Sequence, residues 1–257
     1  MTGHLLEMVT PDGRVDWTAG VVQATGIGMP PNNFSNKFQA NELARVAAWN
    51  VALKNLLKMV KGISVDSATT ISDYMTSDDL FRAKIEGLVK DARIVREEAR
   101  PNGWFQVTVE MKTRGDLLNA LLPSPKRESK PPRSSQEKRV LSDRETYTGL
   151  VLDARGIDAR PALAPRMFTE KGEEVYSFAY LEKQTLAERG ISVYTPDLPS
   201  AQAHPRVGDR PLVIKAIQSQ GRYHTDLIIK TADAQTIHGV SQLLKDAKVL
   251  IILDSQR

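Results

Sequence analysis

The sequence has 257 residues, of which 41% are hydrophobic and 26% are charged, as in an ordinary globular protein. This length allows one large domain or two domains of roughly 100 residues each. No apolar run approaches ~18 residues, so we expect no transmembrane helix. The absence of cysteine excludes disulfides, thiolate metal sites and cysteine nucleophiles.

The basic charge is concentrated in one segment, residues 123–144. This segment has seven basic residues against three acidic ones, so its net charge of +4 equals that of the whole chain, which has 35 basic and 31 acidic residues. Its four prolines and many serines predict a flexible basic linker. Such a linker can contact an anionic membrane surface, although a soluble spacer is the more common use. Because the rest of the chain is balanced in charge, no nucleic-acid partner is expected.

The N-terminal part divides into an extension, residues 1–16, and a first domain, residues 17–122. The extension lacks a basic segment followed by an apolar one, so it is not predicted to be a signal peptide. If the natural protein is exported, we expect this sequence to be a mature or trimmed form. Val21–Ile27 is predicted to be a strand, and its glycine pair lacks the third glycine and the immediate helix of a dinucleotide site. We therefore interpret the pair as a tight turn at the strand end.

The clearest helix of the chain follows and is predicted to end at Gly62. Its apolar face recurs at steps of three and four: Val46, Trp49, Leu53, Leu56 and Val60, widened by Ala48, Ala52 and Met59. The opposite stripe is polar: Asn50, Lys54, Lys58 and Lys61. We interpret this stripe as a solvated face, with an anionic partner as the alternative.

The first domain continues with a strand at Ile63–Ile71 and a shorter helix from Ser77–Asp79 to Leu88. Asn-Gly at positions 102 and 103 predicts a hairpin between Ala92–Ala99 and Trp104–Thr113. The domain is therefore a β-α-β-α-β-β unit with its helices on one face of a sheet.

Residues 145–257 are predicted to form a second domain of α/β type. Its expected elements are a strand at Tyr147–Ala154, a hairpin at Arg166–Phe178, a helix at Leu181–Arg189 closed by Gly190, a strand at Ile191–Tyr194, strands at Leu212–Gln218 and Tyr223–Lys230, a helix after Thr231 and a central strand at Val249–Leu253. The predicted fold class is thus α+β: two small α/β-layer domains, with helices packed on mixed or antiparallel sheets, joined by the basic linker.

The sequence contains no recognisable catalytic motif, and no cofactor is expected. The histidines lack metal-ligand spacing, so no metal site is predicted: His4, His204, His224 and His238. His224 and Asp226 would share one strand face, where a surface contact is favoured over acid–base catalysis.

The most suggestive polar cluster follows the strand of the second domain: Asp153, Arg155, Asp158 and Arg160. Asp153 and Arg155 are two residues apart at a strand end next to Gly156. An arginine there could bind a carboxylate or phosphate of a ligand or partner. The favoured interpretation is a salt-bridge network that holds the Gly156 turn.

Two blocks of sequence carry a resemblance. The first consists of ATGIG, the alanine-rich helix ARVAAWNVALKNLLKMVKGISVDS and a hairpin ending in VTVEM. It resembles the bacterial lipoprotein-twenty (LPP-twenty) family and is similar to the N-terminal domain of flagellar assembly protein T. The second block, TGLVLDARG with PALAPRMF and DAKVLIILD, resembles the segment beyond that domain in larger members.

The resemblance implies a non-enzymatic protein of the bacterial cell envelope, in the periplasm or at the outer membrane, with a role in assembly or protein interaction. Other envelope or flagellar proteins are the implied partners, and self-association is compatible with it. This sequence departs from the family pattern because it has no signal peptide and no lipobox cysteine. The alternative from a different class is a small-ligand-binding or enzymatic module that uses Asp153, Arg155 and the Gly156 turn.

Overall fold

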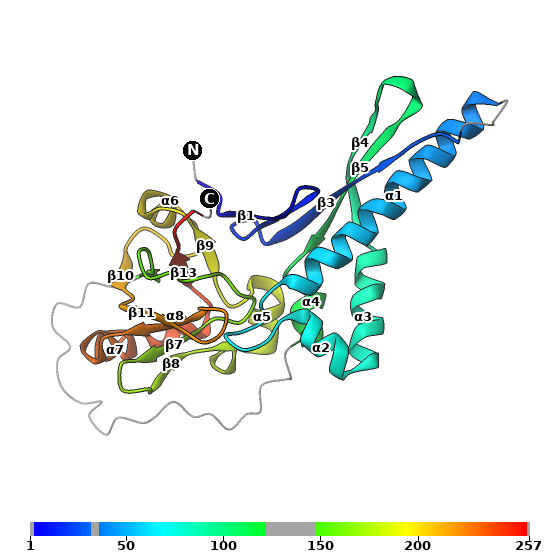
Figure 1. The fold of residues 1–257 in the computed structure, drawn as a ribbon. Helices are drawn as coiled ribbons and strands as arrows, with labels where there is room; N and C mark the ends of the chain where they lie inside the picture. The colour runs from blue at the N-terminus through cyan, green and yellow to red at the C-terminus, as the bar shows by residue number, and fades with distance from the viewer. Residues whose placement is uncertain (1–2, 32–35, 122–146, 256–257) are drawn as a thin grey trace.

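The computed structural model describes residues 3–31, 36–121 and 147–255, which form two α+β units (Figure 1). The predicted fold class is therefore confirmed. The predicted flexible linker, residues 123–144, lies outside the described residues.

The N-terminal unit is built on one antiparallel sheet with the strand order β1-β2-β3-β5-β4. Its elements are β1 (Leu6–Thr10), β2 (Gly13–Asp16), β3 (Val21–Gly28), α1 (Lys37–Gly62), α2 (Ile71–Ser77), α3 (Asp79–Lys90), β4 (Arg93–Ala99), a 3-10 turn (Pro101–Gly103), β5 (Phe105–Lys112) and α4 (Asp116–Leu121). The predicted hairpin of β4 and β5 is confirmed. Within the segment predicted as an extension, residues 1–16, Leu6–Thr10 and Gly13–Asp16 form strands β1 and β2 of this sheet.

Helix α1 packs closely along β3 because small residues line the contact. Its buried alanines recur every four residues, at positions 40, 44, 48 and 52, so they lie on one face. Gly26 and Gly28 of β3 lie against this face, where an added Cβ at Gly26 would be 2.2 Å from the backbone oxygen of Ala48. The glycine pair is thus a site of close helix packing within a strand, and its interpretation as an exit turn was wrong.

In the N-terminal half of α1, the buried face differs from the predicted one. Leu56 and Val60 are buried as predicted, whereas Val46 is 44% exposed. The close approach to β3 requires alanine, so the helix turns its alanines inward and leaves the larger Val46 outside. On the polar stripe, Asn50 and Lys54 are exposed, consistent with a solvated face.

The segment predicted as a strand at Ile63–Ile71 is a loop with a single bridge between Ser64 and Thr70. At the tip of this loop, the Asp66 side chain accepts hydrogen bonds from the backbone N–H groups of residues 68 and 69. The backbone oxygens of Ser64 and Val65 accept N–H groups from the C-terminal unit. The extended pattern is therefore used to contact the other unit, and the prediction of a sheet strand was wrong.

The C-terminal unit contains two four-stranded sheets. Its elements are β6 (Gly149–Asp153), β7 (Arg166–Thr169), β8 (Glu174–Tyr176), a 3-10 turn (Phe178–Tyr180), α5 (Lys183–Arg189), β9 (Val193–Thr195), α6 (Leu198–Gln202), β10 (Pro211–Lys215), β11 (Gln218–Gln220), β12 (Asp226–Ile229), α7 (Thr231–His238), α8 (Ser241–Lys245) and β13 (Val249–Ile252). One sheet is parallel, in the order β10-β6-β13-β9, and the other is mixed, in the order β11-β12-β7-β8. The prediction of a central strand at Val249–Leu253 is confirmed, since β13 lies between β6 and β9.

The two units share one buried apolar cluster that includes residues of both. Trp17 of the first unit meets Tyr194 of the second edge to face, with ring centroids 5.6 Å apart. The hydroxyl of Thr18 donates to the backbone oxygen of Tyr194 over 2.5 Å. This continuous core holds the units together through direct packing.

Candidate functional site

Three loops bring acidic residues to the carboxyl edge of the parallel sheet, the edge where α/β proteins commonly bind ligands. Asp153 ends β6, Asp197 precedes α6, and Asp254 follows β13. Arg155 lies among them, and the charges of Asp254 and Asp197 act on it in addition to that of Asp153. The prediction did not include Asp197 and Asp254, although each follows a buried strand by two residues.

Asp153 and Arg155 form a bidentate ion pair. The Arg155 Nε donates to Asp153 Oδ1 over 2.9 Å and its Nη2 donates to Oδ2 over 2.7 Å. These hydrogen bonds hold the pKa of Asp153 below its usual range, against the opposing effect of burial. The geometry is that of two side chains that satisfy each other.

The other polar groups at this edge are engaged in backbone contacts. The backbone N–H of Gly156, whose φ is +78°, donates to Asp254 Oδ2 over 2.7 Å. Asp197 Oδ1 accepts the backbone N–H of Ser200, also over 2.7 Å. The N–H of Gly3 donates to Ser200 Oγ, so the N-terminal segment lies over this edge. These hydrogen bonds therefore fix the conformations of the three loops that follow β6, β9 and β13.

The structure does not bring the four predicted residues together. Asp153 and Arg155 pair at the sheet edge, whereas Asp158 and Arg160 lie beside His224. Asp158 has a φ of +53°, and its carboxylate is 3.9 Å from the Nδ1 of His224. The backbone N–H of Arg160 donates to the backbone oxygen of His224. His224 precedes β12 with a φ of +55°, and the side chain of Asp226 bonds other partners. The prediction that His224 and Asp226 share one strand face was wrong, because the turn at His224 interrupts the strand alternation.

Asp226 belongs to a buried network that joins the two units. Its carboxylate accepts the hydroxyl of Ser67 over 2.6 Å and the Nε of Arg166 over 2.9 Å. The Nη2 of Arg166 also donates to Ser67 Oγ and to Asp226 Oδ2. No local sequence pattern indicates this network, since Ser67 is 99 residues from Arg166 and 159 from Asp226.

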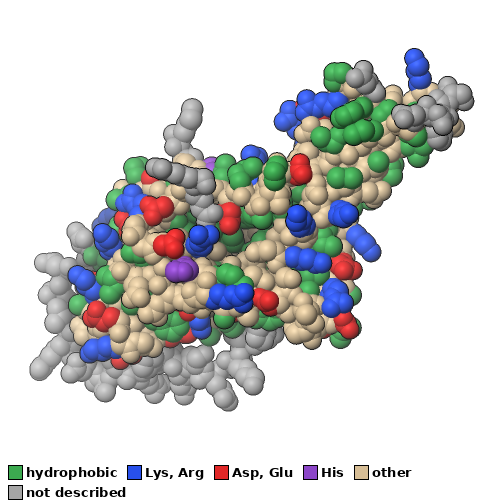
Figure 2. Space-filling model, viewed as in Figure 1, with side chains coloured by type: hydrophobic (Ala, Val, Ile, Leu, Met, Phe, Trp, Pro, Cys, Tyr) green, Lys and Arg blue, Asp and Glu red, His purple; other side chains and the backbone are tan. Residues whose placement is uncertain are grey.

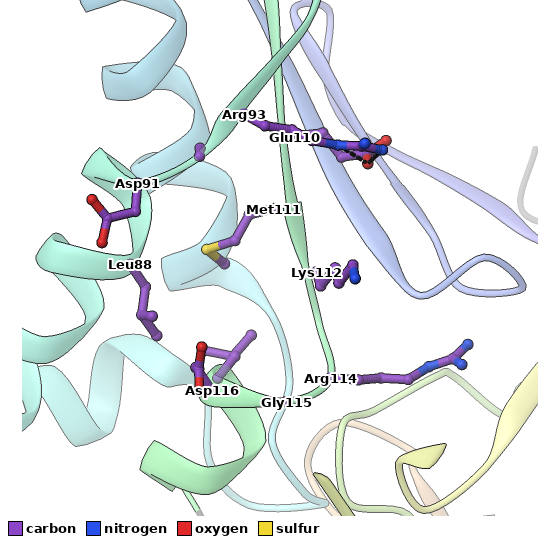
Figure 3. Close-up of a pocket in the computed structure, with 11 residues that line it drawn as sticks. Leu88, Asp91, Arg93, Glu110, Met111, Lys112, Arg114, Gly115 and Asp116 are labelled. Carbon is purple, nitrogen blue, oxygen red and sulfur yellow. Dashed lines mark hydrogen bonds and ion pairs between the residues drawn. The ribbon is translucent and has the colours of Figure 1, made fainter. Parts of the chain in front are cut away.

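An open pocket of about 420 Å³ lies in the N-terminal unit, between the end of α3 and the β5–α4 turn. Figure 3 shows the residues that line it. Its floor is apolar and includes Leu88 and Met111, and its rim carries Asp91, Asp116 and the Arg93–Glu110 ion pair. Burial opposes ionisation of Glu110, but hydrogen bonds from Gln23 and Arg93 keep its pKa below the usual value. Because the rim carries both acidic and basic side chains, it favours neither an anionic nor a cationic ligand.

The described residues contain no group of three or more histidine, aspartate or glutamate side chains that could hold a metal ion. Across residues 3–31, 36–121 and 147–255, no helix has the length and continuous apolar character that a membrane crossing requires.

Replacing Arg155 by alanine is expected to lower the free energy of unfolding by less than about 1 kcal/mol at neutral pH, because both partners are partly exposed to solvent. The pKa of Asp153 is lower in the folded than in the unfolded chain, so the pair stabilises the fold above the ordinary aspartate pKa of about 3.9. This stabilisation is lost as the pH falls through the depressed folded pKa. Urea denaturation of both proteins at neutral and acidic pH measures the effect. A difference that is unchanged at acidic pH would show that the ion pair is not its source.

The fold and these contacts define a two-unit α+β protein whose predicted site residues are engaged in structural contacts. Residues 149–255, which span β6 to β13, match the sequence model of a family described as the second domain of Treponema pallidum Tp0624. No curated protein matches the chain.

Proposed function

We propose that this chain is a non-catalytic component of the bacterial cell envelope, in the periplasm or at the outer membrane, that takes part in assembly by binding another envelope protein. The N-terminal resemblance to the LPP-twenty family and to flagellar assembly protein T supports the envelope setting. The hydrogen bonds of the polar groups at the sheet edge support a non-catalytic role, because Arg155 is paired with Asp153, and Asp254 and Asp197 accept backbone N–H groups.

The observation that carries the proposal is an arm that projects from the body of the molecule (Figure 1). It consists of the outer half of α1, the end of β3 and the β4–β5 hairpin, residues 25–31, 36–50 and 94–107. Gly103 at the hairpin tip lies beside Asn41 and Pro30, so the three segments are packed together. Figure 2 shows hydrophobic side chains gathered over this arm.

Large apolar side chains are unusually exposed on the arm. Phe38 is 73% exposed and Met29 is 59% exposed. Others are Ile27, Leu43, Val46, Ile94, Val95 and Trp104. Many of the nearby charges are neutralised within the arm: Arg45 pairs with Glu42 and Glu97, and Arg96 and Arg100 pair with Glu98. Aromatic and methionine side chains among paired charges are typical of protein-binding surfaces, so we assign the arm to a partner protein with an apolar surface.

Site-specific photocrosslinking in native cells tests this assignment. A photoreactive residue at Phe38 or Trp104 is expected to give a discrete adduct with another envelope protein. The same residue at Gln235, which is exposed on α7 in the C-terminal unit, serves as the matched control. Adducts only with lipid or only with a second copy of the chain would contradict the assignment to a different protein. Fractionation of the same cells tests the setting, and a purely cytosolic location would overturn the envelope role.

A further inference from the structure

The part of α1 that lies in the arm is apolar on two opposite sides. Its alanines pack against β3, as described above. Val46 is two residues from both Ala44 and Ala48, and two residues correspond to a rotation of about 200° around a helix, so Val46 points away from β3. Leu43 is on the same outward side, and the two side chains are 45% and 44% exposed. A helix that is apolar on two sides is normally covered on both.

The outward residues have the spacing of a contact between two helices. Steps of three and four residues connect Leu43, Val46, Asn50, Leu53 and Leu57. This repeat of 3.5 residues keeps one side of a helix against a neighbouring helix over several turns. A single asparagine within such a repeat fixes the alignment of the two helices. The spacing therefore favours a helix as the covering element.

Only one end of this row of residues is covered within the described chain. Leu53 and Leu57 are half-buried and pack against the core, whereas Leu43, Val46 and Asn50 are exposed. Helices α2 and α3 lie beside the C-terminal half of α1, and the arm extends beyond them (Figure 1). We call Leu43, Val46 and Asn50 the exposed stripe. A helix placed on the exposed stripe continues the helical packing of the body along the arm.

The charges of α1 indicate the charge of the covering helix. Helix α1 has five basic residues and a single acidic residue, Glu42, which pairs with Arg45. Lys54 and Lys58 are exposed on one side of the stripe, and no ion pair among the described residues includes them. Residues that flank a contact between two helices normally carry complementary charges. An acidic helix therefore fits the stripe, and α1 of a second copy does not, because its one carboxylate is already paired.

Building on the role proposed for the arm, we propose that the partner protein binds the exposed stripe with one amphipathic helix that carries acidic residues along its flank. The apolar residues of this helix pack against Leu43 and Val46, and its carboxylates pair with Lys54 and Lys58. Removal of the two apolar side chains from water supplies affinity, and the lysines supply selectivity for an acidic partner.

Binding of a synthetic helical peptide to the full chain, measured by fluorescence anisotropy, tests the chemistry of the stripe. The probe has about 20 residues, with leucine at steps of three and four and glutamate on both flanks. Its binding is expected to weaken as the ionic strength rises. Leu43→Gln is expected to weaken binding about tenfold, because a leucine side chain is no longer buried in the contact. Leu80→Gln is the matched control, since Leu80 is 84% exposed on α3 outside the arm.

A second peptide with the same leucines but lysine flanks tests the charge, and it is not expected to bind the wild type. The double variant Lys54→Glu with Lys58→Glu is expected to reverse this preference, so that the lysine-flanked peptide binds more tightly. Absence of binding by the acidic peptide, equal binding of the two peptides by the wild type, or equal effects of Leu43→Gln and Leu80→Gln would overturn the inference.

Photocrosslinking in native cells separates this inference from the function proposed for the arm. A photoreactive residue at Leu43 or Val46 is expected to give an adduct with an envelope protein. Mass spectrometry of the adduct is expected to identify a partner segment in which apolar residues recur at steps of three and four beside acidic residues. An adduct through a segment without this pattern would overturn the helical contact and leave the role of the arm in place. Adducts only with lipid or only with a second copy would overturn both.

Discussion

Replacing Gly26 by alanine is expected to lower the free energy of unfolding by about 3 kcal/mol, the upper range for forcing an extra carbon into a packed contact. The new Cβ would be 2.2 Å from both the backbone oxygen of Ala48 and the backbone nitrogen of Ala52. Because these are backbone atoms, no side-chain rotation relieves the clash, and α1 must move away from β3. Urea denaturation followed by circular dichroism measures the loss.

Gly87→Ala is the matched control for this prediction, since it adds the same methyl group. Gly87 lies inside α3, and an added Cβ there meets nothing within 4 Å. Its replacement is expected to stabilise the protein by roughly 0.5–1 kcal/mol, because alanine restricts the unfolded chain and favours the helix. Equal effects of the two substitutions would show that the α1–β3 contact is not as close as described.

Replacing Arg166 by alanine is expected to cost about 3 kcal/mol of unfolding free energy, because it leaves the carboxylate of Asp226 buried without its positive partner. The side chain of Asp226 is 9% exposed and that of Arg166 is 37% exposed, so solvent reduces the effect from the full value for a buried pair. Since Ser67 of the first unit also binds both groups, the loss is expected to loosen the junction. Urea denaturation together with hydrogen exchange at residues 63–71 measures both consequences.

Arg45→Ala is the control for the loss of an arginine from a solvent-exposed pair. Arg45 bonds Glu42 and Glu97 on the surface of the arm, where solvent screens the charges, so its removal is expected to leave the free energy of unfolding nearly unchanged. The double variant Arg166→Met with Asp226→Leu is expected to be more stable than Arg166→Ala alone, because it removes both charges together. If Arg166→Ala were as mild as Arg45→Ala, the network would have no role in joining the units.

The elements predicted correctly are those with strong local signals. The Asn-Gly pair indicated the β4–β5 hairpin, Gly190 marked the end of α5 with a φ of +69°, and the apolar run VLIIL indicated a central strand. The wrong predictions concern segments whose local sequence pattern is compatible with more than one kind of structure. Ile63–Ile71 alternates like a strand, yet its backbone groups bond within the loop and to the C-terminal unit and do not join a sheet.

In the candidate site, too, the contact between neighbouring residues was predicted, and the contacts between distant segments were not. Asp153 and Arg155 were predicted as a salt bridge at a turn, and the pair forms because two residues at a strand end lie on one side of it. Asp254 and Asp197 reach the same edge only through the order of the parallel strands. Sequence spacing contains no information about that order.

Local periodicity and composition were enough to predict the α+β class, most helix and strand positions, and the concentration of net positive charge in residues 123–144. The contact of Gly26 with α1 and the network of Ser67, Arg166 and Asp226 could be found in the folded structure but not in the sequence. These arrangements depend on contacts between residues far apart in the chain, which arise from the packing of whole elements and leave no local pattern in the sequence.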